Sequence, residues 1–270
     1  TIAAAEAGLH VFCEKAMART VKECWQMVEI CEQQSVKLMI GHKRRLRPPW
    51  KRMIELTGIE LLGEALAITV CQYCDRRSYA FFDRWWGSAE KVGGCLHLQG
   101  VHVVDWFRAM CGDAASVTAN YGPQQDVRYQ LPDLCHTTFQ FKTGALASIN
   151  SSLSYPLHQF REGQGPWGQC RNGGFKLVPH MENIDLYWQR LDDDRVTYER
   201  FDDLGVDVAF RREVGDFVRW ITEDFQPCLT WVEGLRCVEM MEAAYHSAEV
   251  GGVPVTFPLH PDLERSVKKI

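Results

Sequence analysis

The stretch that decides the fold is HVFCEKAMA, residues His10–Ala18, an apolar segment that ends in an acid and a lysine. A helix that stops at Gly8 comes before it, so the pattern predicts a strand over 10–13. In an open parallel sheet, ligands bind beyond the carboxyl ends of the strands. We therefore expect Glu14 and Lys15 to lie at a ligand-binding edge.

A second strand follows after one helix. The sequence TVKE at 20–23 is a capping box and predicts a helix start, and TWVE at 230–233 predicts another near the end of the chain. The apolar run over 36–40 predicts a short strand. A strand, a helix and a strand within about 32 residues indicate a βαβ unit with parallel strands. Residues 1–45 thus read as the end of a doubly wound α/β domain.

The pattern changes after Pro48 and Pro49, where short alternating segments are joined by tight turns such as 142–144. Such segments favour antiparallel hairpins. The predicted strands span 65–73, 116–121, 134–141, 145–153, 175–178, 184–189, 196–201 and 253–258. The predicted helices span 50–57, 98–111, 208–222 and 230–249, and 162–174 is expected to be a loop. Residues 46–270 therefore predict an α+β domain with a large, open, mostly antiparallel sheet.

Composition limits the class of protein. The 270 residues are 46% hydrophobic and 24% charged with a net charge of -5, which argues against a nucleic-acid partner. The basic run over 43–47 is expected to be a solvated strand end, or alternatively an anion or substrate contact. Eleven cysteines in odd number, with no apolar run of about 18 residues and no signal peptide, predict a cytoplasmic protein without a membrane partner.

Metal binding has little support in the sequence. The single C-x-x-C, Cys71 with Cys74, lies in a predicted strand rather than at a helix start. The group Cys95, His97 and His102 has no second dyad at zinc-finger spacing. No metal site is predicted.

Two motifs resemble the glucose-fructose oxidoreductase, inositol dehydrogenase and rhizopine-catabolism (Gfo/Idh/MocA) family of nicotinamide-dependent oxidoreductases. AGLHVFCEKAMA, residues 7–18, is similar to its AGKHVxxEKPxA signature, and GGCLHLQGVHVVD, residues 93–105, to its GGGxxxDxGxHxxD block. The resemblance covers nearly all of the chain. It implies that 1–45 is the tail of a Rossmann NAD(P)-binding domain and that 46–270 binds substrate and supports oligomerisation.

The resemblance also implies roles for individual residues. Lys15 would orient the substrate oxygen beside the nicotinamide, and Glu14 would contact the cofactor ribose together with Lys15. From chemistry alone, a lysine at a strand mouth can donate to a hydroxyl or carbonyl, and a histidine such as His102 titrates near neutral pH. Lys15 and His102 are therefore the predicted catalytic residues. The simpler alternatives are a solvated loop lysine and a core histidine.

Weaker candidates for substrate binding are Asp105, Arg45 and Trp86. Asp105 lies one helical turn beyond His102, so it is expected to orient that histidine or to bind sugar hydroxyls. Arg45 is expected at the exit of the second strand. Trp86, with neighbouring aromatic residues at 79 and 85, could stack on a sugar face, although such clusters are more often core or subunit contacts.

The chain departs from the family pattern at two positions and in one motif. Ala16 replaces the proline that usually follows the lysine in a cis peptide, and Leu98 replaces the acid that often precedes the histidine by four residues. No G-x-G-x-x-G follows a strand, although the family carries one before its signature. We therefore expect residues to precede Thr1, and residues 1–270 alone to bind dinucleotide poorly and to turn over little.

The predicted function is hydride transfer between NAD or NADP and a hydroxyl-bearing carbon of a sugar, cyclitol or related polyol. The sequence does not distinguish NAD from NADP. Alternatives are a non-catalytic binding or scaffolding relative, and an NAD-dependent glycosidase or lyase of the same fold. A homo-oligomer, a dimer or tetramer, is expected through an open sheet face. That face is predicted to carry Thr137, Phe139, Phe141, Ala145, Ala147 and Ile149.

Overall fold

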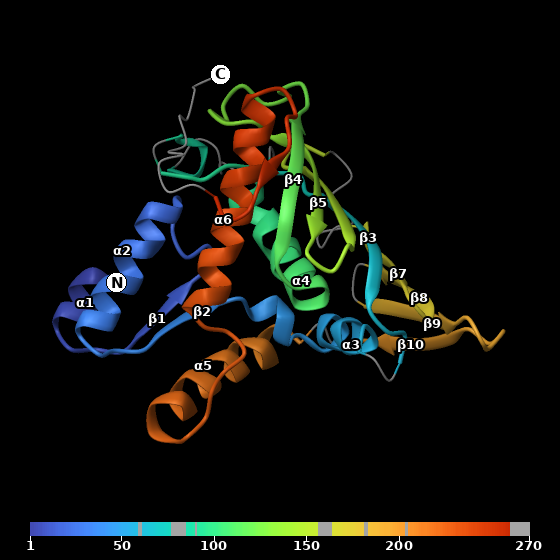
Figure 1. Ribbon diagram of the computed structural model, residues 1–270, viewed down its shortest axis with the longest axis horizontal. Coiled ribbons are helices and arrows are strands. Elements are labelled where there is room, and N and C mark those ends of the chain that lie inside the picture. Colours follow the sequence, from blue (N-terminus) through green and yellow to red (C-terminus); the bar gives the residue numbers. More distant parts are fainter. Residues whose placement is uncertain are drawn as a thin grey trace.

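The computed structural model describes residues 1–58, 61–76, 85–89, 91–155, 164–180, 183–202 and 205–259. Two sheets make up the architecture, a small parallel one and a large mixed one. In Figure 1 the long helix α6 (Trp231–Glu249) stands between the N-terminal unit and the large sheet. The predicted fold class, α/β with a large and mostly antiparallel sheet, is confirmed.

The N-terminal unit is the predicted βαβ unit. It contains α1 (Ile2–Glu6), β1 (Val11–Glu14), α2 (Val21–Gln33) and β2 (Leu38–Gly41). β1 and β2 pair in parallel, with Glu14 opposite Gly41. The capping box at 20–23 is present, because the Thr20 hydroxyl and the Glu23 carboxylate each accept a backbone N–H of the other residue. Local sequence therefore sets where this helix begins.

A 3-10 turn, η1 (Lys43–Leu46), and helix α3 (Pro48–Leu56) lead into the large sheet. Its nine strands lie in the order β10-β9-β8-β7-β3-β6-β5-β4-β11. β3 and β6 are parallel, and the other neighbours are antiparallel. The strands are β3 (Ala65–Tyr73), β4 (Ala114–Tyr121), β5 (Leu134–Phe141), β6 (Leu146–Ser152), β7 (Gln164–Cys170), β8 (Gly173–Pro179), β9 (Ile184–Arg190), β10 (Thr197–Phe201) and β11 (Val255–Thr256).

The prediction of a loop over 162–174 was wrong for its described part. Residues of β7 and β8 form a hairpin there, and β7 pairs with the central strand β3. The glycines that suggested a loop are needed for packing, because a Cβ at Gly168 would collide with the ring of Phe175 on the neighbouring strand. A glycine inside a strand often marks such a close approach.

The face of the sheet predicted to be open is the covered one. Thr137, Phe139 and Ile149 are all fully buried, and the ring of Phe139 lies 6.4 Å from that of Phe107 on α4 (Val101–Cys111). Figure 1 shows α4 and α6 packed against this side of the sheet. Alternation identified residues that share a face, but helix packing decides which face is buried.

The exposed face carries one row of residues paired from strand to strand. Trp167, Lys176, Tyr187 and Tyr198 lie opposite one another on β7, β8, β9 and β10. The Lys176 amine lies 4.7 Å above the Trp167 ring, and the two tyrosine rings are 5.1 Å apart. Large aromatic side chains on this face therefore pack on one another while remaining partly exposed.

The remaining helices agree with the sequence. A π-helical turn, η3 (Leu96–Gly100), precedes α4, which ends at Gly112 with φ +82°. Helix α5 (Val206–Thr222) packs on η1, and β11 is an edge strand beside β4, as predicted for the C-terminal segment. Within the described ranges, no helix is long and apolar enough to cross a membrane.

Candidate active site

The carboxyl edge of the parallel strands holds the two residues predicted there. β1 ends at Glu14, and the Lys15–Ala16 peptide that follows is cis. The Lys15 Nζ donates a hydrogen bond to the backbone oxygen of Leu98, 3.1 Å away. Burial, followed by the positive charges of Arg44 and Lys43, lowers the pKa of Lys15 to about 8. This amine is therefore turned into the fold rather than solvated in a loop.

Glu14 lies at the same edge and is exposed. Its carboxylate pairs with the Lys43 amine at 3.3 Å. Lys43 belongs to η1, directly after β2, so the ends of both parallel strands contribute to this pair. The arrangement leaves Glu14 accessible to a ligand at the sheet edge.

A double glycine shapes the start of the middle helix. A Cβ at Gly93 would collide with the His97 ring, and Gly94 has φ +104° with the Tyr245 hydroxyl 2.6 Å from where its Cβ would lie. The Leu96 N–H donates to that hydroxyl at 2.7 Å, and the His97 ring stacks on Tyr245. His97 thus packs against α6, whereas Cys95 lies beside Cys135 in the core. The sequence group of Cys95, His97 and His102 does not converge on one point.

His102 faces the same region as Lys15. It lies one turn after Leu98 on the continuous η3–α4 segment and is 4% exposed. Burial, then the positive charges of Arg44 and Lys15, hold the pKa of His102 well below its ordinary value. Its Nδ1 has no hydrogen-bond partner among the described residues. A neutral imidazole has one ring nitrogen with a lone pair, which can accept a proton.

Asp105 and Arg45 lie together, but they bind each other. Arg45 donates to both carboxylate oxygens of Asp105, at 2.6 and 3.1 Å, and Asp105 is 1% exposed. Arg45 also pairs with Glu233 at 2.9 Å, and Arg108 reaches the same Glu233 at 3.3 Å. This arrangement favours a structural ion-pair network for Asp105 and Arg45, and their contacts with substrate stay a prediction.

The second capping box, predicted at 230–233, forms only in part. Thr230 is the N-cap of α6, and its hydroxyl accepts the Val232 N–H. Glu233, however, binds the two arginines described above instead of closing the box. Charged partners from η1 and α4 replace the weaker local hydrogen bond.

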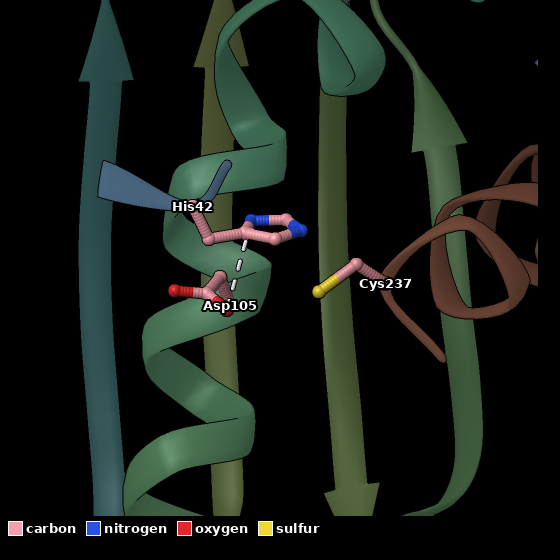
Figure 2. A group of neighbouring side chains, drawn as sticks. All are labelled: His42, Asp105 and Cys237. Atoms are coloured by element: carbon pink, nitrogen blue, oxygen red, sulfur yellow. Dashed lines mark ion pairs between the residues drawn. The ribbon is translucent and has the colours of Figure 1, made fainter. Parts of the chain in front are cut away.

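A buried group of His42, Asp105 and Cys237 was not expected from the sequence (Figure 2). One potential ligand atom of each lies within 4.8 Å of the others, and the His42 Nδ1 is 3.6 Å from the Asp105 Oδ1. Burial lowers the pKa of His42 and raises that of Cys237, so both favour their neutral forms. The Asp105 Oδ1 already accepts a 2.6 Å hydrogen bond from Arg45, so a metal ion would compete with that guanidinium.

Three other candidates from the sequence are Trp86, the aromatic residue at 79 and the C-x-x-C motif. Trp86 is half-buried against the core and stacks on the exposed Trp85, with ring centroids 4.0 Å apart. The aromatic residue at 79 lies outside the described residues. All eleven cysteines are free, and the Cys74 thiol donates to the Ser152 backbone oxygen, so the C-x-x-C does not form a disulfide.

Sequence reasoning missed His42 and Glu213 near this edge, and it considered Arg44 only as part of the basic run over 43–47. His42 and Arg44 follow the end of β2 as Lys15 follows β1, so the carboxyl-edge rule that located Lys15 could also have located them. Glu213 lies on α5, and one carboxylate oxygen would be 3.5 Å from a Cβ at Gly41. No local signal reveals Glu213, because the contact joins residues far apart in the chain.

The chain is similar both to family models and to proteins of known activity. The family described as "Oxidoreductase family, NAD-binding Rossmann fold" matches residues 1–42, and the GFO/IDH/MocA C-terminal domain matches residues 50–166. A D-xylose 1-dehydrogenase (NADP(+)) of Haloferax volcanii is 27% identical over 257 residues, covering 92% of this chain and 74% of that protein. A 2,7-anhydro-N-acetylneuraminate hydratase of Mediterraneibacter gnavus is 26% identical over 211 residues, covering 72% of this chain and 54% of that protein.

Solved structures share the fold. The aldose-aldose oxidoreductase from Caulobacter crescentus, complexed with glycerol, superposes with a TM-score of 0.81 at 22% identity, over 94% of this chain and 74% of that one. The WlbA dehydrogenase from Bordetella pertussis, in complex with NADH and UDP-GlcNAcA, has a TM-score of 0.79 at 24% identity, over 96% and 75%. The two family models, which match residues 1–42 and 50–166 and together cover more than half of the chain, show that it belongs to the GFO/IDH/MocA family of oxidoreductases.

Proposed function

We propose that the protein is an NAD(P)-dependent dehydrogenase that moves a hydride between the nicotinamide and a hydroxyl-bearing carbon of a sugar, cyclitol or related polyol. The observation that carries the proposal is the meeting of Lys15 and His102 at the carboxyl edge of β1 and β2. His102 is buried and Lys15 is partly buried, and the positive charge of Lys15 is among those that lower the pKa of His102. The D-xylose dehydrogenase relative supports a sugar substrate.

In this proposal the two side chains divide the work on the substrate hydroxyl. Lys15 donates a hydrogen bond to the substrate oxygen and fixes its position, with the Leu98 carbonyl orienting the amine. His102 accepts the hydroxyl proton through a free ring nitrogen when the alcohol is oxidised and returns it in reduction. The nicotinamide, when bound, supplies the hydride chemistry.

The residues present fit one end of a dinucleotide. Glu14 is exposed at the carboxyl edge of the parallel strands, where it could accept hydrogen bonds from ribose hydroxyls beside Lys15. The sequence contains no G-x-G-x-x-G for the phosphates. We therefore assign Glu14 and Lys15 to the nicotinamide side of the cofactor and assign no residue to the pyrophosphate.

We further propose that residues 1–45 serve the cofactor and 46–270 serve substrate binding and self-association. The exposed face with Trp167, Tyr187 and Tyr198 supports a homo-oligomer, because such aromatic side chains are enriched at subunit interfaces. Free cysteines throughout support a cytoplasmic location. Sedimentation of the protein with and without Trp167→Ser tests the interface.

The activity test uses the protein purified from its natural source. It is mixed with NAD⁺ or NADP⁺ and a panel of aldoses and cyclitols, while nicotinamide absorbance is followed. We expect reduction of the nucleotide with at least one sugar and its loss in Lys15→Met. Lys142→Met, at a side chain that is 65% exposed, is the matched control and should keep full activity. Equal rates for both variants would reject the role of Lys15.

A second candidate function is lyase or hydratase chemistry with transient oxidation of the substrate. The similarity to the 2,7-anhydro-N-acetylneuraminate hydratase favours it. Such an enzyme regenerates its cofactor in every cycle, so substrate would be consumed without net change in nicotinamide absorbance. A non-catalytic relative would bind a sugar but convert none.

A further inference from the structure

A buried histidine, aspartate and cysteine meet where three elements pack together. His42 directly follows β2, Asp105 lies on α4 and Cys237 lies on α6. Each is at most 1% exposed, and one potential ligand atom of each lies within 4.8 Å of the others. Figure 2 shows the Cys237 sulfur directed toward the His42 ring and Asp105. The three side chains therefore converge on one buried point.

A glycine on α6 brings the cysteine close to the histidine. A Cβ at Gly234 would lie 2.6 Å from the Cγ1 atom of Ile40 on β2, so the helix lies closer to this strand than a larger residue would allow. Cys237 is one helical turn after Gly234 and shares its face, and His42 is two residues after Ile40. Close packing of α6 on β2 thus positions the pair.

His42 is the member of the group whose ring nitrogens have no hydrogen-bond partner among the described residues. Its Nδ1 is 3.6 Å from the Asp105 Oδ1, beyond hydrogen-bond distance. A buried polar atom without a partner is unfavourable, and a bound water or ion commonly explains one. Two atoms bound at about 2.0 to 2.1 Å to a tetrahedral zinc ion lie about 3.4 Å apart. The observed separation is close to that spacing.

The donor atoms of the group indicate which metal ion would bind. Zinc takes imidazole nitrogen, thiolate sulfur and carboxylate oxygen, and this group offers one of each. Magnesium and calcium take oxygen ligands instead. On binding, the Cys237 thiol loses its proton to solvent and coordinates as the thiolate.

Arg45 weakens such a site without blocking it. Its guanidinium donates to the Asp105 Oδ1 at 2.6 Å, so its positive charge lowers the affinity for a cation. The same guanidinium donates to the Asp105 Oδ2 at 3.1 Å and to Glu233 at 2.9 Å. A carboxylate oxygen has two lone pairs, so Oδ1 can bind an ion while Arg45 keeps its other partners.

We propose that His42, Asp105 and Cys237 bind one Zn²⁺ ion. Water completes the tetrahedral set, as it does at other zinc sites with three protein ligands. Because all three side chains are buried, the ion joins the end of β2 to α4 and α6. Asp105 is one turn after His102, so the ion also holds the helix that carries the proposed proton acceptor. The site goes beyond the dehydrogenase proposal and does not depend on it.

The test begins with zinc binding by the protein purified from its natural source. Zinc content is measured by elemental analysis before and after treatment with a chelator, and the treated protein is titrated with Zn²⁺ by calorimetry. We expect one Zn²⁺ ion per chain with a dissociation constant of about 1 μM or below. Excess Mg²⁺ should not displace it, because the sulfur and nitrogen ligands favour zinc.

Variants assign the ligands. Cys237→Ser and His42→Phe should each weaken Zn²⁺ binding about a hundredfold or more, because losing a residue that only supports a ligand already costs about 10- to 100-fold. Cys31→Ser, at a buried cysteine on α2 outside the group, is the matched control. It should bind Zn²⁺ as tightly as the natural protein.

X-ray absorption at the zinc edge of the unchanged protein decides the question even if a variant does not fold. We expect sulfur at about 2.3 Å and nitrogen and oxygen at about 2.0 to 2.2 Å from the ion. Three results would each overturn the inference. They are binding weaker than about 1 μM, a zinc ion without a sulfur neighbour, and folded Cys237 and His42 variants that bind as tightly as the natural protein.

Discussion

Glu213 gives the sharpest prediction on stability. Its side chain is fully buried on α5, and neither carboxylate oxygen has a hydrogen-bond partner among the residues described. Burial, then the charge of Glu14, raises the pKa of Glu213 from 4.5 to about 7, and Lys43 opposes the change. Each pKa unit is worth about 1.4 kcal/mol, so ionising this group in the folded state costs about 3 kcal/mol.

The direction of the pH effect follows from the linkage between proton binding and folding. The folded pKa is raised, so the contribution of Glu213 is fully present below about pH 4.5 and is lost as the pH rises through about 7. Glu213→Gln cannot ionise, so its free energy of unfolding relative to the natural protein should rise by about 3 kcal/mol between pH 4.5 and 8. The lowered pKa values of His42 and His102 affect both proteins equally and cancel in this difference.

The assay is urea unfolding at several pH values, with fixed salt and protein concentration. Glu29→Gln, at an exposed position on α2, is the control and should stay level with the natural protein. A difference between Glu213→Gln and the natural protein that does not change with pH would refute the reasoning. That result would mean the carboxylate is hydrated or finds a partner when charged.

Four further variants, with Arg195→Met as a control, test packing, charge and helix propensity. Arg45→Met should cost about 3 to 5 kcal/mol in urea unfolding, because it leaves a buried carboxylate unpaired, whereas Arg195→Met at an exposed pair should leave the free energy of unfolding almost unchanged. Gly93→Ala should cost about 1 to 3 kcal/mol, since its Cβ meets the histidine ring four residues later. Gly215→Ala, in open space within a helix, should stabilise by about 0.5 to 1 kcal/mol, and a loss would contradict this. Raising the pH from about 8 to 10 should stabilise the natural protein relative to Lys15→Met, because the folded state releases the lysine proton first.

Local signals account for the elements that the sequence predicts well. The capping box at 20–23, the apolar run of β2 and the glycine after α4 each act within a few residues, and the structure has all three. The prediction for strand β7 was wrong because its packing depends on residues from other strands. Its glycine and proline residues are unfavourable for a strand locally, and the facing ring of Phe175 explains Gly168 among them. Propensity is overridden wherever a neighbour from another strand decides the packing.

The residues of the candidate site also separate into those with a local signal in the sequence and those without one. Lys15 and His102 belong to contiguous motifs, so the sequence could identify both. Glu233 illustrates the limit, because its local pattern indicates a helix cap while Arg45 and Arg108 from other elements bind it. Ion pairs of this kind join residues that are far apart in the chain, so no local sequence pattern reveals them.

The measurement that tests the central claim most directly is isotope transfer. The natural protein is incubated with NADH or NADPH deuterated at the hydride position and with the ketose or lactone forms of candidate sugars, and products are analysed by mass spectrometry. The account predicts one deuterium in a sugar or polyol product, lost in Lys15→Met and kept in Lys142→Met. Products free of deuterium with both nucleotides, or undiminished transfer in Lys15→Met, would contradict it.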